Sequence, residues 1–77
     1  MEKGNKYLLI VIQIEGGMSC EVHTSLKDAN ESFDEQEKNT SYNIGVAIYD
    51  LGESTRFGMG DYGFYGEPIR EWENEEI

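Results

Sequence analysis

One continuous apolar run dominates the hydrophobic pattern of this chain. It occupies residues 7–14 and is rich in β-branched side chains. Both alternating sets of side chains in the run are apolar up to Gln13, which is typical of a strand covered on both of its faces. The β-branched content and the glycines that follow favour a strand over a buried helix. We therefore predict a central strand of a sheet here.

The glycine pair that follows predicts a turn and an antiparallel strand over residues 18–23. The pattern allows two registers. A two-residue turn would place Gln13 opposite Cys20, whereas a three-residue loop with a bulge would place Ile14 there, and this single step exchanges the two faces. We favour the three-residue loop, because it collects the isoleucines with Cys20 and Val22. On this interpretation Cys20 is a small buried residue.

A helix is predicted next, from Ser25 to about Lys38. The Ser25 hydroxyl is a good N-cap, and Asp28 stands where a capping box places an acid. The apolar side chains of this segment recur at helical spacing, so they form a narrow stripe that would pack on the sheet. The stripe consists of Leu26, Ala29 and Phe33.

A second clear strand is predicted over residues 42–50. One of its faces is aliphatic and includes Val46 and Ile48, whereas the other is small in its middle, at Gly45 and Ala47. Because small residues let another layer approach closely, we expect the helix on the small face.

The last third of the chain is glycine-rich and aromatic, and then acidic. Residues 55–59 are a candidate short strand, and Phe64 with Tyr65 could form another. Pro68 suits the first position of a short helix that would carry Trp72 on its apolar side.

Together these elements predict a single α+β domain over residues 1–77, with frayed ends at 1–5 and 74–77. The expected order is β-β-α-β-β, with three to five strands in an antiparallel-leaning sheet and one main helix on one face. One helix leaves the second face of the sheet bare. The aromatic segment, the tail or a second copy must cover that face, so a homodimer is one expected arrangement.

Residues 58–63 have the G-x-G-x-x-G spacing of dinucleotide-binding loops. That function requires a preceding strand and a following helix, and the sequence after this stretch is a poor helix start. We interpret the stretch as a glycine-rich hairpin.

Phe57 and Phe64 are expected to close the second face of the sheet. Tyr62 and Tyr65 are better suited to contact a partner, because a hydroxyl tolerates a wet rim.

No pattern of catalytic, cofactor-binding or metal-binding residues emerges. The only histidine, His23, and the only cysteine, Cys20, are predicted on opposite faces of one strand, so they would not share a metal ion. We therefore predict that the protein is not an enzyme and needs no cofactor. The single cysteine and the shortness of the apolar run predict a cytoplasmic protein without a membrane span.

Charge changes this picture most. Sixteen Asp and Glu against six Lys and Arg give a net charge of −10, whereas small domains typically carry a magnitude of roughly 2–8. Nucleic acids and anionic membranes would repel such a chain, so no direct binding to either is expected. The partner that this charge favours is a basic protein surface.

The acids also have a pattern along the predicted helix. Asp28, Glu31 and Glu35 would follow one helix face at axial steps of roughly 4.5 and 6 Å. Duplex DNA presents a phosphate about every 3.4 Å on each strand, so a rigid row of carboxylates could occupy a basic groove meant for nucleic acid. In size and charge the chain resembles phage-encoded inhibitors of host defence, anti-CRISPR proteins among them. This resemblance implies an acidic inhibitor that mimics nucleic acid.

The alternative hypothesis is a small adaptor or subunit that binds its partner through aromatic and apolar side chains. Charge would then serve solubility alone. The candidate partner-binding residues under the two hypotheses are Asp28, Glu31, Asp34, Glu35, Tyr62, Tyr65, Glu71, Trp72 and Glu73.

Overall fold

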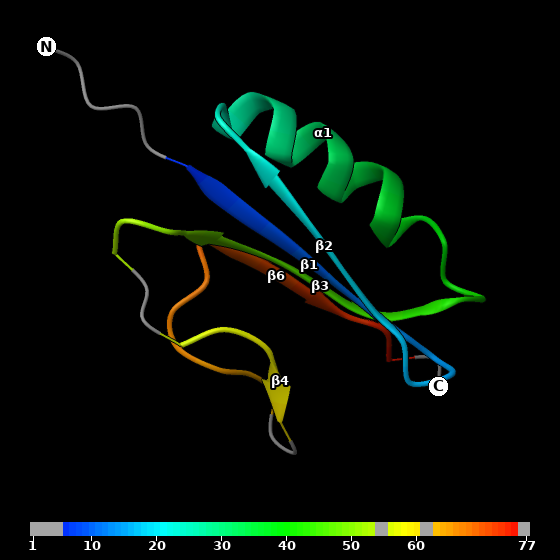
Figure 1. Cartoon of the computed structure of the whole chain (residues 1–77). Helices are drawn as coiled ribbons and strands as arrows, with labels where there is room; N and C mark the ends of the chain where they lie inside the picture. Colours follow the sequence, from blue (N-terminus) through cyan, green and yellow to red (C-terminus); the bar gives the residue numbers. More distant parts are fainter. Residues whose placement is uncertain (1–5, 54–55, 61–62, 76–77) are drawn as a thin grey trace, which may run out of the picture.

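A four-stranded antiparallel sheet carries one helix on one face and a small two-stranded sheet on the other (Figure 1). This computed structural model describes residues 6–53, 56–60 and 63–75. The main sheet has the order β2-β1-β3-β6. The elements are β1 (Tyr7–Gln13), β2 (Met18–His23), α1 (Leu26–Glu37), β3 (Asn43–Asp50), β4 (Met59–Gly60), β5 (Gly63–Phe64) and β6 (Arg70–Glu73). The predicted α+β class is confirmed.

The apolar run forms β1, which is a central strand as predicted. It pairs antiparallel with β2 on one side and with β3 on the other. Leu9 and Val11 pack toward the helix in one core cluster, together with Phe33. Ile10 belongs to a second cluster on the opposite face, with Tyr49. Because both faces are packed, the run shows no alternation of apolar and polar residues.

Helix α1 has the predicted boundaries and cap. The Ser25 hydroxyl accepts a hydrogen bond from the backbone N–H of Asp28 at 3.4 Å, and the helix begins at the next residue after Ser25. Ala29 and Phe33 are buried against the sheet, as the apolar stripe predicted. Leu26, at the start of the stripe, remains 37% exposed. The helix therefore contributes two well-buried side chains to the core.

The predicted register between β1 and β2 is wrong, although the division of faces is right. Ile10 lies opposite Cys20, where we expected Ile14 or Gln13. Since this pairing differs from the favoured one by four residues, an even number, the isoleucines still share a face with Cys20 and Val22.

The turn lies earlier in the sequence than the glycine pair suggested. The Gln13 N–H donates to the Gly17 carbonyl at 2.8 Å, so the loop is centred between them. Gly16 takes a φ of 93° in this loop, which glycine adopts without steric cost. Ile14 lies in this loop, and its N–H donates to the carbonyl of Tyr42 at 2.8 Å, next to the pairing of Gln13 with Asn43. A contact with the segment before β3 therefore helps to set the register.

The helix packs on the aliphatic face of β3 and not, as we predicted, on the small face. Val46 and Ile48 belong to the helix-side core. A Cβ added to Gly45 would lie 2.7 Å from Met59 Cε and 3.0 Å from Phe64 Cζ. The small residues of β3 do admit a closely packed layer, but that layer is formed by β4 and β5.

The acidic tail forms a strand where we predicted a short helix. Strand β6 pairs antiparallel with β3, and Trp72 lies opposite Val46. Trp72 is partly buried against the helix-side core. The strand begins just after Ile69, whose N–H donates to the Ile48 carbonyl at 2.7 Å. A partner strand more than twenty residues upstream therefore decides the conformation of the tail.

Within the end that is predicted to fray from residue 74, Asn74 is hydrogen-bonded to the segment before β3 and to the start of β3. The Asn74 side chain donates to the carbonyls of Thr40 and Asn43 at 2.6 and 3.0 Å. The fraying predicted for residues 1–5 and 76–77 lies outside the described part of the chain.

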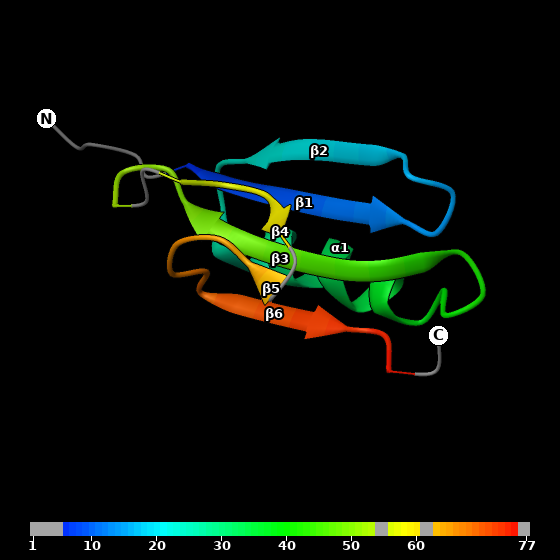
Figure 2. The ribbon, with the colours of Figure 1, turned by 90° about the horizontal axis from the view of Figure 1, so that it is seen from below.

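The glycine-aromatic segment, described at residues 56–60 and 63–66, covers the second face of the sheet over β3 (Figure 2). Phe64 packs on the core cluster of that face. Phe57 meets the Tyr49 ring edge-on, with centroids 5.2 Å apart. The Tyr49 hydroxyl donates to the carbonyl of Tyr65 at 2.6 Å. Phe57 and Phe64 thus close this face, as predicted, but the cover does not reach across β2.

Removing the Tyr49 hydroxyl should weaken this cover in a pH-dependent way. Burial raises the pKa of Tyr49 above its ordinary 10.0, so the hydroxyl stabilises the fold fully below about pH 10 and this contribution is lost as pH rises through the folded-state pKa. Tyr49→Phe is expected to lower the free energy of unfolding by about 0.5–1.5 kcal/mol at neutral pH. Urea titrations of both proteins between pH 7 and 11 measure this difference.

The control is Tyr42→Phe, because Tyr42 is 46% exposed. Its stability should follow that of the parent protein at every pH. A stability difference between Tyr49→Phe and the parent that stays constant up to pH 11 would contradict the pKa shift.

Candidate functional site

Arg70 divides the acids of α1 into two groups. Its guanidinium donates to Asp34 at 2.8 Å, to Glu37 at 3.2 Å and to Asn30 at 2.8 Å. It also lies 3.9 Å from the centroid of the Phe33 ring. The acids on the β6 side of the helix therefore have a fixed counter-charge. Asp34, one of the predicted partner-binding residues, forms an internal ion pair.

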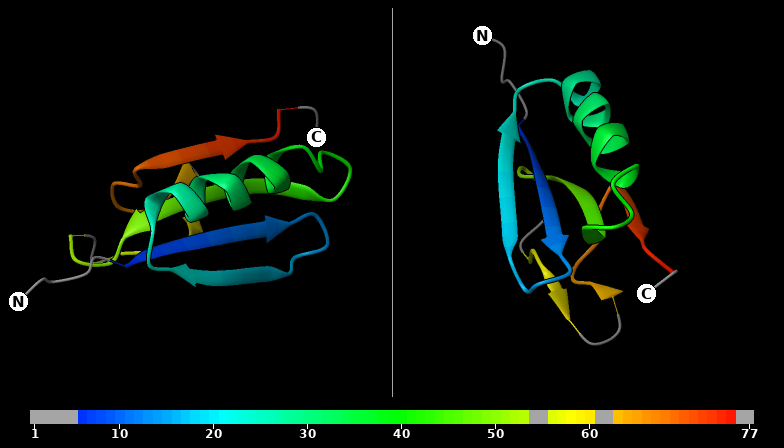
Figure 3. Two further views of the ribbon diagram at one scale, coloured as in Figure 1. Left: turned by 90° about the horizontal axis from the view of Figure 1, so that it is seen from above. Right: turned by 90° about the vertical axis from the view of Figure 1, so that its right-hand side faces the viewer.

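The other side of the helix lies toward β2 (Figure 3, left). Ser32 identifies that side, because its hydroxyl donates to Glu21 of β2 at 2.9 Å. Asp28 and Glu35 precede and follow Ser32 by four and three residues, which places all three on one side of the helix. Both acids are exposed, and neither forms an ion pair within residues 6–53, 56–60 and 63–75. Uncompensated negative charge thus lies beside the β2 edge of the sheet.

Glu31 lies farther out on the helix and has only a loose partner. Lys27 Nζ is 3.0 Å from Glu31 Oε2, and both side chains are more than half exposed. The hydrogen bond from the ammonium to this carboxylate raises the pKa of Lys27. An exposed pair of this kind is held weakly and is screened by salt, so Glu31 remains available to a stronger partner.

Glu21 adds a more firmly held anion on β2 itself. His23 Nε2 lies 2.9 Å from Glu21 Oε1, and the Ser32 hydroxyl donates to the same oxygen. These two hydrogen bonds, the one to His23 first, lower the pKa of Glu21. Its charge therefore persists to a lower pH than that of an ordinary glutamate.

The predicted tail residues do not join this acidic surface. Glu71 and Glu73 lie opposite Ala47 and Gly45, so they are on the face of the sheet away from the helix. Trp72 points the other way, into the helix-side core. The structure therefore separates acids that the sequence pattern allowed us to group.

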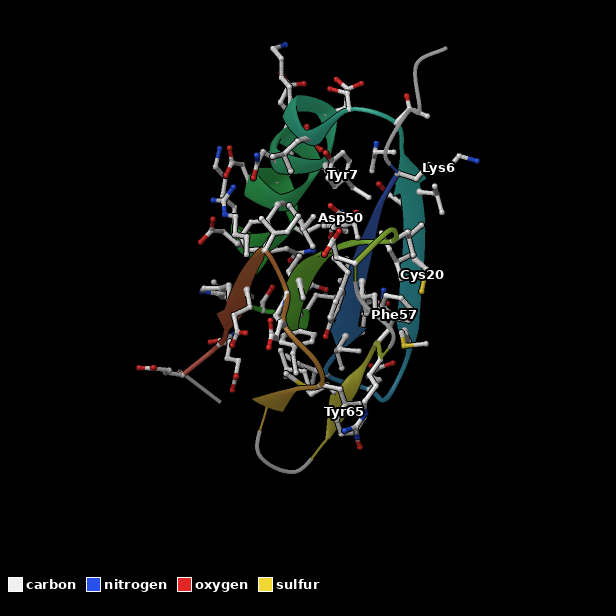
Figure 4. The ribbon with its side chains drawn as sticks, turned by 90° about the vertical axis from the view of Figure 1, so that its left-hand side faces the viewer. Lys6, Tyr7, Cys20, Asp50, Phe57 and Tyr65 are labelled. Atoms are coloured by element: carbon white, nitrogen blue, oxygen red, sulfur yellow. The ribbon has the colours of Figure 1, made fainter. Side chains whose placement is uncertain are left out.

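Tyr65 lies on the second face of the sheet and is 42% exposed. Figure 4 shows it on the segment that crosses this side of the molecule. The Arg56 guanidinium is 5.0 Å from its ring centroid. Tyr65 also borders a shallow hollow of about 540 Å³ whose lining includes Ile12, Met18 and Met59. Tyr62, its predicted companion, lies outside the described part of the chain.

The free edge at β2 carries an apolar row that sequence reasoning missed. Met18 and Val22 are 60% and 58% exposed, and Cys20 between them is exposed as well (Figure 4). The prediction that Cys20 is buried is wrong. The alternation of apolar and polar residues in 18–23 was visible in the sequence, but it could not indicate that the covering layer stops short of this strand.

Two kinds of feature are absent from the residues that the structure describes. Among them, no three His, Cys, Asp or Glu side chains are grouped to hold a metal ion. None of their helices is long and apolar enough to cross a bilayer. The candidate interaction surfaces among these residues are the uncompensated acids of α1, the neighbouring edge of β2 and the hollow beside Tyr65. No protein-family model matches this chain, and comparisons with curated proteins and with solved structures found no similar protein.

Proposed function

We propose that this protein is a non-enzymatic binding protein whose acidic surface engages a basic surface of another protein. In its specific form, the proposal is that α1 mimics nucleic acid and blocks a nucleic-acid-binding complex. An anti-defence protein of the anti-CRISPR type would act in this way, in the cytoplasm. The net charge of −10 supports the proposal at the level of the whole chain.

The observation that carries the proposal is the row of exposed acids on a rigid helix. Asp28, Glu31 and Glu35 project from a capped helix that Ala29 and Phe33 anchor to the sheet. An anchored row loses less conformational entropy on binding than a flexible acidic tail would. Its axial steps of roughly 4.5 and 6 Å are longer than the roughly 3.4 Å between successive phosphates of one DNA strand, but they are of the same order.

Neutralising the row should weaken binding while leaving the fold intact. The test variant combines Asp28→Asn, Glu31→Gln and Glu35→Gln. Affinity capture from the source cell, eluted with a salt gradient, is expected to release the partner at lower salt from this variant, with an affinity about tenfold or more below that of the parent. Added DNA or RNA should compete with the partner.

The matched control neutralises three exposed acids away from the helix, at Glu53, Glu67 and Glu75. Both variants have the same net charge, so only the position of the charge differs. Equal weakening in the two variants would contradict a specific role for α1. Binding that is insensitive to salt would contradict the proposal as a whole.

The hollow beside Tyr65 supports a second candidate function, an adaptor that binds through aromatic and apolar contacts. The apolar side chains in its lining, among them Ile12, Met18 and Met59, could receive a side chain of a partner. In the same capture experiment, Tyr65→Ala would then abolish binding, whereas the neutralised helix would bind normally. That result would replace the acidic hypothesis with the adaptor.

A further inference from the structure

We infer that the free edge of β2 is a docking site for an extended, basic segment of the partner protein, which adds to the main sheet as a further strand beside β2. This inference rests on the proposed function, since it specifies the basic partner that the acidic surface would engage. It follows from a comparison of the two edges of the sheet, from the backbone of β2 and from the charges around it.

The two edges of the main sheet differ in how well they are protected. Natural sheets usually blunt an edge with charged residues, proline, a bulge or a very short strand. Strand β6 is only four residues long and three of them are charged, among them Arg70, which is tied to α1. Strand β2 has six residues, pairs with β1 without a bulge, and contains neither proline nor lysine. It is therefore the edge that is open to another strand.

The unpaired backbone N–H and C=O groups of β2 belong to alternate residues of the strand. Residues of an antiparallel strand point their N–H and C=O alternately toward one neighbour and then the other. Because Gln13 bonds with Gly17, residues 19, 21 and 23 also point toward β1. Met18, Cys20 and Val22 therefore present their N–H and C=O groups to the free side, and their exposed side chains lie on the face away from the helix.

The side chains on the two faces of this edge indicate which residue types a docking strand would carry. On one face, the Met18–Val22 row is apolar and is continuous with the hollow beside Tyr65 through Met18. On the other face lie Glu21, with its lowered pKa, and the uncompensated Asp28 and Glu35 of the helix. A strand that alternates apolar and basic residues would meet both faces with complementary chemistry.

Charge disfavours a second copy of this chain at the same edge. Pairing two β2 strands would bring together two chains that each carry −10. It would also bring the Glu21, Asp28 and Glu35 groups of both copies to one interface. Like charges across a strand pair are destabilising, so a basic partner fits this edge better.

The first test uses a synthetic peptide of about seven residues in which lysine and valine alternate, a length that spans one edge strand. Its binding is followed by fluorescence anisotropy at low salt and by the backbone amide shifts of the ¹⁵N-labelled protein. The largest shifts are expected at Met18, Cys20 and Val22. Two control peptides keep the same side chains. One carries methyl groups on the backbone nitrogens of its valines, and the other carries them on the backbone nitrogens of its lysines. One of the two should lose at least about tenfold in affinity, because methylation removes the donors of its pairing edge.

The second test changes the protein. Cys20→Pro removes one outward N–H at a position where an edge strand tolerates proline. Cys20→Val keeps that N–H and an apolar side chain. The proline variant is expected to bind the alternating peptide about tenfold more weakly than the valine variant. Trp72 fluorescence and thermal unfolding verify that both variants fold, and if the proline variant does not fold, the methylated peptides decide alone.

The outcomes separate this inference from the proposed function. If both methylated peptides bind as well as the parent peptide, and salt releases all three, the added strand is overturned while acidic recognition stands. If no lysine peptide binds at low salt, acidic recognition fails and the docked strand fails with it. Sedimentation that shows a dimer of the parent protein which Cys20→Pro dissociates would also overturn the inference, because a second copy would then occupy the edge.

Discussion

Replacing Phe33 with alanine is expected to lower the free energy of unfolding by about 3–5 kcal/mol. The Phe33 ring is 1% exposed and packs in the helix-side core with Leu9 and Val46. The Arg70 guanidinium lies 3.9 Å from its ring centroid, so the substitution also removes a cation–π contact. A chain of 77 residues has a total stability of about 4–12 kcal/mol, so this loss would leave a large unfolded population.

Urea denaturation followed by the fluorescence of Trp72, the only tryptophan, measures the effect. Leu26→Ala is the matched control, because Leu26 belongs to the same helix stripe but is 37% exposed. It should cost about 1 kcal/mol or less. If the two variants lose similar amounts of stability, the helix is not anchored by Phe33 as the structure indicates.

Replacing Gly45 with isoleucine is expected to detach the glycine-aromatic segment from the sheet. A Cβ at Gly45 would lie 2.7 Å from Met59 Cε and 3.1 Å from Phe64 Cε2, and the rest of the isoleucine needs more room still. Overpacking of this kind costs about 1–3 kcal/mol. Trypsin should then cleave faster after Arg56, which lies at the start of this segment, while the helix-side core stays folded.

The control is Gly52→Ala, whose Cβ would come no closer than 3.4 Å to the atoms around it. Cleavage after Arg56 should be unchanged in this variant, and Trp72 fluorescence should be close to that of the parent in both. Unchanged cleavage of the isoleucine variant would show that the segment adapts, and the close fit over β3 would be contradicted. If the isoleucine variant shows both faster cleavage and a loss of Trp72 fluorescence, the two faces of the sheet unfold together.

The candidate site could be predicted only in part. Helical spacing was enough to place Asp28, Glu31 and Glu35 on a solvent-facing side of α1. The same spacing could not reveal that Asp34 is held by Arg70, since the two are 36 residues apart. Nor could it reveal that Glu71 points away from the helix, because the face depends on how β6 pairs with β3.

Two errors in the fold have the same origin. The glycine pair suggested where the first hairpin turns, but the chain turns earlier, where Gln13 bonds with Gly17 and Ile14 bonds with Tyr42 of the segment before β3. Likewise, the small face of β3 correctly indicated a close approach by another layer. The path of the chain between β2 and β3 decides which layer packs on this face. Side-chain size alone does not specify that path.

The sequence by itself determined the central strand over residues 7–14, the capped helix after Ser25 and the negative charge. Each of these depends on residues within a few positions of one another, through side-chain periodicity, a local hydrogen bond or simple composition. The tertiary structure alone decided the register, the tail strand, the ion pair of Asp34 with Arg70 and the bare edge at β2. These depend on contacts between segments far apart in the chain, which compete with one another and are resolved only when the whole core packs.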